Sequence, residues 1–341
     1  MNPIAVFAGG YTVYWSAVVI AFGMAAALSL TLGLHPRYER RNTAVWVMFP
    51  FAVFFSVLFS RFLHWYCHIE YYPSFLAAMS DYSRGSFVLP GVLMGTWLAG
   101  RLVSGLRLTR STGRLLDAAA PGMALCIAFI RLSALFNNSC RGRMTITNGS
   151  FQSLPFASPL MDAAGNTSYH FATFFVEFLL MLLVTGILTA YYFRYRKRPM
   201  KGGFSNDGNA ARMFLLLYGG VEIIMDSTRY DSHLMHFTFL KMLNPYASFI
   251  SVAQVFAAAS ILCVFLRFLV ISLRTNGFRW YHVPSVLLFL AFLFGIGYLG
   301  EYKVQRTGRF LVCYLWQGSS ILLMILVVCL IFASCKKRES T

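Results

Sequence analysis

The sequence is poor in charged residues, and acidic residues are especially few. Only 12% of its 341 residues are charged, whereas a soluble globular domain has roughly 25%. Hydrophobic residues make up 58% and occur in long runs. This composition excludes an ordinary soluble protein and predicts an all-α, polytopic membrane protein.

The sequence also lacks the patterns typical of metal centres, cleaved secretion signals and internal repeats. Its seven cysteines show no metal-binding or redox spacing, so we expect no metal and no cofactor. His64 and His68 lie four residues apart, but a place among interfacial aromatic residues explains them better than a pair of metal ligands. Cys67 and Cys140 could pair in an oxidising compartment, although two free thiols are favoured. The N-terminus has no basic signal-peptide region, so the first apolar run is expected to be a retained span.

Apolar segments long enough to cross a bilayer occur along the whole chain. About 20 residues of helix span a hydrocarbon core of about 30 Å. We predict a transmembrane bundle of about nine spans, near residues 10–33, 44–65, 87–105, 115–137, 170–193, 211–228, 247–273, 281–300 and 311–334. The least apolar are 87–105, which proline and glycine interrupt, and 211–228, which carries two acids.

The positions of the basic residues predict the orientation of the bundle. With the N-terminus outside, 19 of the 29 lysines and arginines fall on the inner side, around residues 37–41, 101–114, 194–212 and 267–279 and in the C-terminal tail. The positive-inside rule therefore places the C-terminus in the cytoplasm. We expect a bacterial inner-membrane protein whose charge of +17 meets anionic lipid head groups and no nucleic acid.

Two parts of unequal size are expected within this bundle. Residues 1–274 would form a seven-helix core with a polar outer loop at 138–169, and residues 275–341 would add a two-helix hairpin and a basic tail. One predicted outer segment carries three basic residues, Lys303, Arg306 and Arg309, and is therefore an exception to the positive-inside rule.

Ionisable residues inside the predicted spans indicate a site. Arg131 lies late in the fourth span, where a guanidinium costs several kcal/mol unless it meets a partner or an anionic ligand. Glu177 lies in the middle of the fifth span. The sixth span presents one polar face at helical spacing, formed by Tyr218, Glu222, Asp226 and Arg229. Such a face cannot contact lipid.

Two interpretations of these residues remain open at this point. One is an internal charge network, with Asp226 paired to Arg229 and with Glu177 or Glu222 paired to Arg131. The other is a polar cavity for a charged head group near the outer leaflet. The spacing favours neither.

Further donors follow Arg131 at the outer end of the fourth span, namely Asn137, Asn138, Ser139, Arg141 and Arg143. Guanidinium groups form paired hydrogen bonds with phosphate oxygens and amides add neutral donors, so this set suits a phosphodiester head group. A solvated helix end is the alternative, and it is stronger for Arg141 and Arg143 than for Arg131.

An ordered series of short motifs covers residues 11–262. It comprises YTVYWSAVVIAFG, Ser60-Arg61, GVLMG at 91–95, LLDAAAPGMALCIAFIRL with Asp117, Ala120-Pro121 and Arg131, Glu177, the series Tyr218-Gly219, Asp226, Arg229 and Asp231, and Ser251 with Gln254. In this order and spacing, the motifs resemble those of the prolipoprotein diacylglyceryl transferase family.

The resemblance implies an enzyme that transfers the diacylglyceryl group of phosphatidylglycerol, or of another anionic phospholipid, to the thiol of a lipobox cysteine in a preprotein, with formation of a thioether. Arg131 would clamp the phosphate, and Arg229 would be a support or a second clamp. We also expect Glu222, from its place on the polar face of the sixth span, to be a catalytic residue. No metal or soluble cofactor is required. The substrate-binding positions would be Arg61, Asn137, Asn138, Arg143, Glu177, Tyr218 and Asp226.

The chain departs from the family pattern at three positions. Pro90 replaces a histidine found in many members, Ala134 replaces an asparagine, and Glu222 replaces an arginine and thereby reverses a charge. A proline cannot exchange a proton. The alternative is therefore a non-catalytic relative that binds or moves an anionic lipid or peptide. A small-ion or metabolite transporter would show an inverted repeat, which the sequence lacks.

Overall fold

The computed structural model describes residues 4–8, 11–35, 42–69, 71–81, 89–136, 140–161, 166–194, 200–229 and 251–336. Seven helices in this part of the chain are long and apolar enough to cross a membrane. They are α1 (Trp15–Leu34), α2 (Thr43–Cys67), α5 (Thr112–Ser133), α7 (Thr173–Arg194), α10 (Val252–Asn276), α11 (His282–Gly297) and α13 (Phe310–Ser334). The prediction of an all-α polytopic membrane protein is confirmed.

The two remaining predicted spans are also helices, α4 (Leu89–Gly105) and α8 (Asn209–Thr228). Neither is among the seven helices that are apolar enough to count as a span. Helix α8 is nevertheless mostly buried, because it packs against α5, α7, α10 and α13. Its polar side chains are thus covered by protein, as a polar face within a membrane requires.

The start of the first predicted span differs from expectation. Residues Tyr11–Tyr14 form strand β2, which pairs antiparallel with β1 (Ile4–Ala8). Aromatic and β-branched residues favour strand here, and helix α1 begins only at Trp15. The apolar run therefore includes a hairpin as well as a helix.

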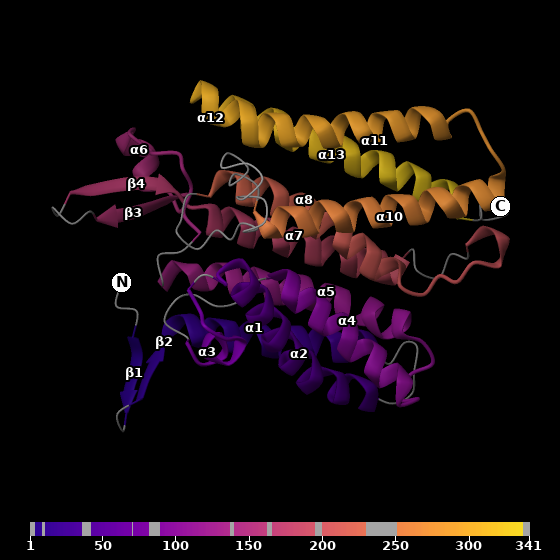
Figure 1. Ribbon diagram of the computed structural model, residues 1–341, viewed down its shortest axis with the longest axis horizontal. Helices are drawn as coiled ribbons and strands as arrows, with labels where there is room; N and C mark the ends of the chain where they lie inside the picture. The colour runs from indigo at the N-terminus through magenta and orange to yellow at the C-terminus, as the bar shows by residue number, and fades with distance from the viewer. Residues whose placement is uncertain are drawn as a thin grey trace.

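The helices form two groups (Figure 1). Helices α1, α2, α4 and α5 lie together, with α2 packed on α4 and α1 on α5. Helices α7, α8, α10, α11 and α13 form the second group. Helix α5 joins the two groups, because it packs on both α7 and α8. Residues of α5 and α8 that lie deep in the bundle thus meet across this junction.

The short elements gather mainly at one end of the bundle (Figure 1). The β1–β2 hairpin, α3 (Phe75–Ser80), α6 (Gly149–Gln152), the antiparallel strands β3 (Ala157–Met161) and β4 (Thr167–Phe171), and α12 (Val304–Thr307) all lie there. The polar segment 138–169 thus contains a short helix and one strand of a hairpin. Short 3₁₀-helical turns occur at Ala134–Phe136 and Lys201–Gly203, and a π-helical turn occurs at Tyr298–Lys303. Among the described residues, Cys67 and Cys140 form no disulfide with each other, as favoured from the sequence.

Small residues allow α2 and α4 to approach closely. A Cβ atom at Gly91 would overlap the backbone of Ser60, and one at Gly95 would overlap the backbone of Ser56. Because backbone atoms cannot move aside as a flexible side chain can, these two glycines set the separation of the helices. Arg61, which follows Ser60, is held at a fixed place by this contact.

Substitution of Gly91 tests this packing. We expect Gly91→Ala to lower the thermal unfolding midpoint, because the added methyl group must separate α4 from α2. Gly186→Ala in α7 is the matched control, because nothing lies within 4 Å of its Cβ position and alanine favours a helix by about 1 kcal/mol over glycine. Equal midpoints for the two variants, measured in detergent, would contradict the close contact.

Candidate functional site

A buried acid of helix α5 positions helix α8, which carries several of the site residues. The carboxylate of Asp117, which is 0% exposed, accepts hydrogen bonds from the backbone N–H groups of Gly208 at 2.8 Å and Ala211 at 3.0 Å. These groups lie at the start of α8, where backbone donors have no partner inside the helix and where negative charge is favourable. Asp117 therefore fixes the start of α8 against α5.

About four turns further along α5, Arg131 meets two acids from the second helix group. Its Nε donates to Glu177 Oε1 at 2.6 Å, and its Nη2 donates to both carboxylate oxygens of Glu222 at 2.8 and 2.9 Å. Its Nη1 contacts the sulfur of Cys140 at 3.6 Å. All four residues are buried, so the hydrogen bonds satisfy charges that would otherwise be costly in this environment.

The polar face predicted on α8 is present. Tyr218 and Glu222 are buried on it, and Phe214 stacks on the Tyr218 ring. The Tyr218 hydroxyl and Glu177 Oε2 are buried and have no hydrogen-bond partner within the described residues. Two polar atoms beside the charged residues are thus available for a proton or a ligand.

At the end of α8, a second ion pair forms. Arg229 Nη1 donates to Asp226 Oδ1 at 2.7 Å, and Ser251 Oγ donates to Asp226 Oδ2 at 2.6 Å. Gln254 and Ser251 form a reciprocal capping box at the start of α10. Arg229 and Glu177 are close enough for their charges to interact. The two ion pairs therefore belong to one cluster of charges.

The segment that follows α5 attaches to this cluster through its backbone. Gly142 forms an antiparallel bridge with Arg229. Arg143 donates from its backbone N–H to the Thr228 carbonyl at 2.8 Å and from Nε to the Arg229 carbonyl at 3.0 Å. Arg141 is 7% exposed, and burial lowers its pKa from the ordinary value. The contacts of Arg143 thus hold it at the end of α8, against a residue 86 positions further along the chain.

The structure brings most of the predicted site residues together. Glu177, Glu222, Asp226, Arg229 and Arg143 lie around Arg131 and the end of α8. The pairs expected of an internal charge network are present, and protein atoms contact all three guanidinium nitrogens of Arg131. Arg131 in this arrangement is not an open phosphate clamp. The predicted residues Asn137, Asn138 and Asp231 lie outside the described residues.

Arg61 is fully buried in α2, near a cavity whose lining residues come from α1, α2, α4 and α5 and include Val57. The cavity has a volume of about 320 Å³ and an apolar lining that extends from Ala119 to Ile130 along α5. Val57, one helical turn before Arg61, lines its outer part. At 1.5 Å per residue, the cavity runs about 16 Å along α5, which is about half the hydrocarbon thickness of a bilayer. The cavity thus has the depth of one leaflet.

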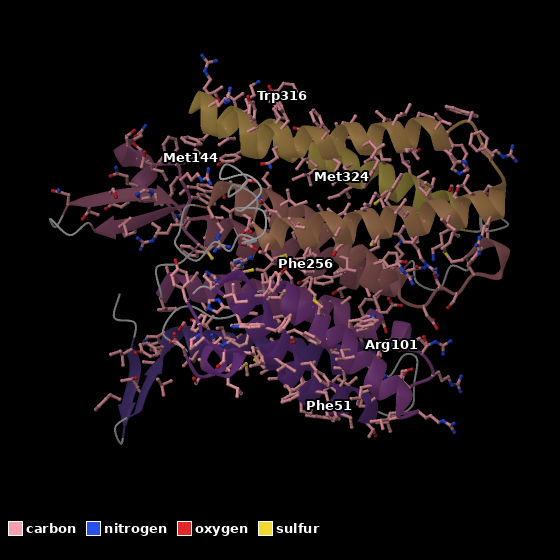
Figure 2. All side chains as sticks on the ribbon, viewed as in Figure 1. Phe51, Arg101, Met144, Phe256, Trp316 and Met324 are labelled. Atoms are coloured by element: carbon pink, nitrogen blue, oxygen red, sulfur yellow. The ribbon has the colours of Figure 1, made fainter. Side chains whose placement is uncertain are left out.

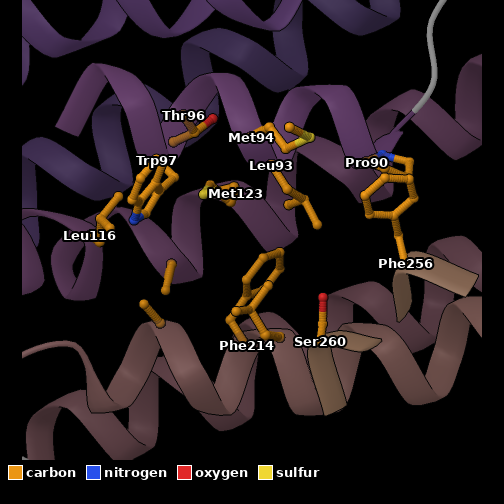
Figure 3. Close-up of a pocket in the computed structure, with 13 residues that line it drawn as sticks. Pro90, Leu93, Met94, Thr96, Trp97, Leu116, Met123, Phe214, Phe256 and Ser260 are labelled. Atoms are coloured by element: carbon orange, nitrogen blue, oxygen red, sulfur yellow. The ribbon is translucent and has the colours of Figure 1, made fainter. Parts of the chain in front are cut away.

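A second hollow of about 240 Å³ separates α4 and α5 from α8 and α10 (Figure 3). Trp97 and Leu93 lie on one side of it, and Phe214 and Ser260 lie on the other. Pro90, at a position where the family pattern often has a histidine, lies beside Phe256. The surroundings of Pro90 are therefore apolar. Ala134, the second departure, is buried in the turn that follows α5.

Two residues that the sequence analysis missed reach the end of α8 from α13. Tyr314 Oη donates to the Ser227 carbonyl at 2.8 Å, and Gln317 Nε2 donates to Ser227 Oγ at 3.0 Å. Gln317 could have been found from the sequence, because it is an amide within a strongly apolar helix, where a polar side chain requires a partner.

Among the described residues, no group of three or more His, Cys, Asp and Glu side chains could hold a metal ion.

Comparisons with known proteins agree with this description. The family model "Prolipoprotein diacylglyceryl transferase" matches residues 3–271. A phosphatidylglycerol–prolipoprotein diacylglyceryl transferase of Acaryochloris marina is 28% identical over 234 residues, which are 66% of this chain and 78% of the relative. Enzymes with the same name from Streptococcus agalactiae and Lactococcus lactis are 24% and 26% identical over 68% of this chain and cover 86% and 84% of their own lengths.

The buried ion pairs of Arg131 can be tested by its removal. We expect Arg131→Ala to lower the free energy of unfolding by about 3–5 kcal/mol, because two buried carboxylates would lose their cation. Chemical unfolding in detergent micelles would measure it. Arg101→Ala, at an exposed position of α4, is the control and should change stability by less than about 0.5 kcal/mol. Similar values for both variants would disprove the buried pairs.

Proposed function

The chain belongs to the prolipoprotein diacylglyceryl transferase family, and from this premise we propose that it transfers the diacylglyceryl group of phosphatidylglycerol to the thiol of a lipobox cysteine. The match covers the first helix group, α7, α8 and most of α10, and it includes every residue of the charge cluster. The names of the relatives support the same activity. The chain therefore acts as a membrane-bound transferase in lipoprotein biosynthesis.

The reaction forms a carbon–sulfur bond and breaks a carbon–oxygen bond. A cysteine thiolate attacks the glycerol carbon that carries the phosphate, and glycerol phosphate leaves with the electron pair. The phosphate thereby changes from a diester with one negative charge to a monoester that carries more. Catalysis thus requires a base for the thiol proton and positive charge near the phosphate.

The contact of Arg143 with the end of α8 is the observation that carries our assignment. We assign the phosphate to Arg143 and Arg229, with Arg141 beside them. The bridge from Gly142 to Arg229 supports this placement, because it holds the backbones of both segments together. Guanidinium groups suit this role because their paired donors match phosphate oxygens and stay charged at any physiological pH.

In this assignment, Arg131 holds the carboxylates of Glu177 and Glu222 in place by hydrogen bonds. Its hydrogen bonds to Glu222 account for the reversed charge at that position, because both carboxylate oxygens face a guanidinium and not the lipid phosphate. Glu177 Oε2 is buried and has no hydrogen-bond partner within the described residues, so it can accept a proton. We therefore assign the thiol proton to a carboxylate of this cluster.

We assign the cavity among α1, α2, α4 and α5 to one acyl chain of the lipid. Its apolar lining and its depth suit such a chain. Arg61 follows the outer lining of the cavity by one turn, at a position where a cation can attract an anionic head group. The hollow between α4 and α8 (Figure 3) supplies a second apolar surface at the side of the bundle.

The membrane arrangement that fits this reaction has nine spans, with the N-terminus outside and the C-terminus in the cytoplasm. Burial of α4 and α8 within the bundle supports counting both as spans. Figure 2 supports the orientation, because Arg101 of a basic inner segment lies toward the end opposite Met144 of the outer segment. We further propose a bacterial inner membrane, a secreted preprotein as the thiol substrate, and a division into a core of residues 1–274 and an added hairpin of residues 275–341.

Loss of the outer-segment arginines tests the assignment of the phosphate. We expect Arg143→Gln and Arg229→Gln each to lower kcat/KM for phosphatidylglycerol about 10- to 100-fold, because each removes a charge-assisted hydrogen bond. Mass spectrometry of a lipobox peptide would follow thioether formation. Arg309→Gln, at an exposed position of the C-terminal hairpin, is the matched control and should retain activity.

The same assay tests the activity itself. The wild-type chain should sustain growth of a bacterial strain depleted of its own transferase. Failure to do so, together with an unmodified lipobox peptide, would exclude catalysis. Selective retention of phosphatidylglycerol without turnover would instead support the non-catalytic alternative.

Filling the cavity tests the acyl-chain assignment. We expect Ala52→Phe, which adds a ring to the cavity lining, to raise the KM for long-chain phosphatidylglycerol several-fold and to leave short-chain lipid unaffected. Ala25→Phe, at an exposed position of α1, is the control. An equal change in KM for both chain lengths would show that the cavity does not receive an acyl chain.

A further inference from the structure

Helix α13 lies beyond the family match, which ends at residue 271, yet it packs closely on the helix that carries the acids. A Cβ atom at Gly220 of α8 would lie 2.9 Å from Ile321 and 3.0 Å from Ile325. One at Gly318 of α13 would lie 3.1 Å from Ile224. Glycines on both helices thus bring α8 and α13 into close contact.

The polar contacts between the two helices centre on Ser227. Its hydroxyl donates to the Ile223 carbonyl at 2.8 Å and accepts from Gln254 at 2.9 Å and from Gln317 at 3.0 Å. Its backbone carbonyl accepts from Tyr314 at 2.8 Å. The hydroxyl donor and both acceptors of Ser227 are therefore used, and two of the bonds come from α13.

These contacts satisfy a helix end that adjoins the site. The last four carbonyls of a helix have no partner within it. In α8 they accept from Thr228 Oγ1, the Arg229 N–H, Tyr314 Oη and the Arg143 N–H, in the order Met225, Asp226, Ser227 and Thr228. The outer segment and α13 therefore secure the residues on either side of the Asp226–Arg229 pair.

Apolar packing alone would not require a glutamine at position 317. Its side chain is 1% exposed, and a buried amide in a membrane helix is costly unless hydrogen-bonded. Its nitrogen lies 3.0 Å from Ser227 Oγ and 3.4 Å from the Ile296 carbonyl, while its oxygen has no partner among the described residues. The shorter of the two contacts of the amide nitrogen is thus with the end of α8. Gln254, which also donates to Ser227, completes the capping box with Ser251 at the start of α10.

We propose that Gln317 and Tyr314 are positioning residues, which hold Asp226 and Arg229 in the geometry needed for transfer by fixing Ser227. The proposal rests on the proposed function, because it assigns to Arg229 a role at the lipid phosphate. It makes the C-terminal hairpin part of the catalytic apparatus, although neither residue touches the substrate.

A double-mutant cycle on the full-length chain tests this proposal. Gln317→Leu and Tyr314→Phe should each lower kcat about fivefold to tenfold, because each removes a hydrogen bond to Ser227 that orients the Asp226–Arg229 pair. The KM for phosphatidylglycerol should change less than kcat, because the misplaced charge acts mainly on the transition state. Tyr302→Phe removes a hydroxyl from an exposed tyrosine of the same hairpin and should leave both constants unchanged.

Ser227→Ala completes the cycle. If Gln317 acts through Ser227, Gln317→Leu should add little to the kinetic defect of Ser227→Ala. Additive defects, or a lower thermal midpoint with unchanged kcat, would overturn the proposal and leave the hairpin a purely structural role.

A wild-type chain without transferase activity would refute the proposed function and not this inference. The cycle would then be measured on retention of phosphatidylglycerol by the purified protein. Non-additive losses of retained lipid for Gln317→Leu and Ser227→Ala would support positioning, and additive losses would refute it.

Discussion

Placement of one arginine between two acids inside a membrane bundle constrains the rest of this structure. Arg131 belongs to α5, whereas Glu177 and Glu222 belong to α7 and α8. Because an unpaired charge at this depth would cost several kcal/mol, the three helices must keep their relative positions. Asp117 fixes the start of α8 against the same helix. The junction between the two helix groups is therefore defined by polar contacts at both ends of α5.

Helix α8 carries little of the hydrophobic character of a membrane span and most of the chemistry of the site. It can do so because neighbouring helices cover its polar face and because groups from three directions complete its C-terminal end. The outer segment provides arginines, α10 provides Ser251 and Gln254, and α13 provides Tyr314 and Gln317. The positive charge assigned to the lipid phosphate and the acids assigned to the thiol proton thus lie around one helix end.

Much of this arrangement was predictable from the sequence. The apolar runs predicted the helices, and the spacing of Glu222, Asp226 and Arg229 predicted that they share a face of α8, because an α-helix repeats every 3.6 residues. The pairing of Arg131 with the acids was one of two open interpretations, since spacing within helices does not reveal which helices touch. The strand at Tyr11–Tyr14 was missed because an apolar run does not distinguish strand from helix over so few residues.

The sequence by itself determined the class of protein, the approximate positions of its helices and the family, because composition, periodicity and motif order are local properties of the chain. Only the tertiary structure decided that Arg131 faces two carboxylates rather than an open site, that Arg143 meets Arg229, and that α13 supports the end of α8. These contacts join residues separated by about 46 to 91 positions. They depend on how close the helix backbones approach, which small residues such as Gly220 permit but do not specify.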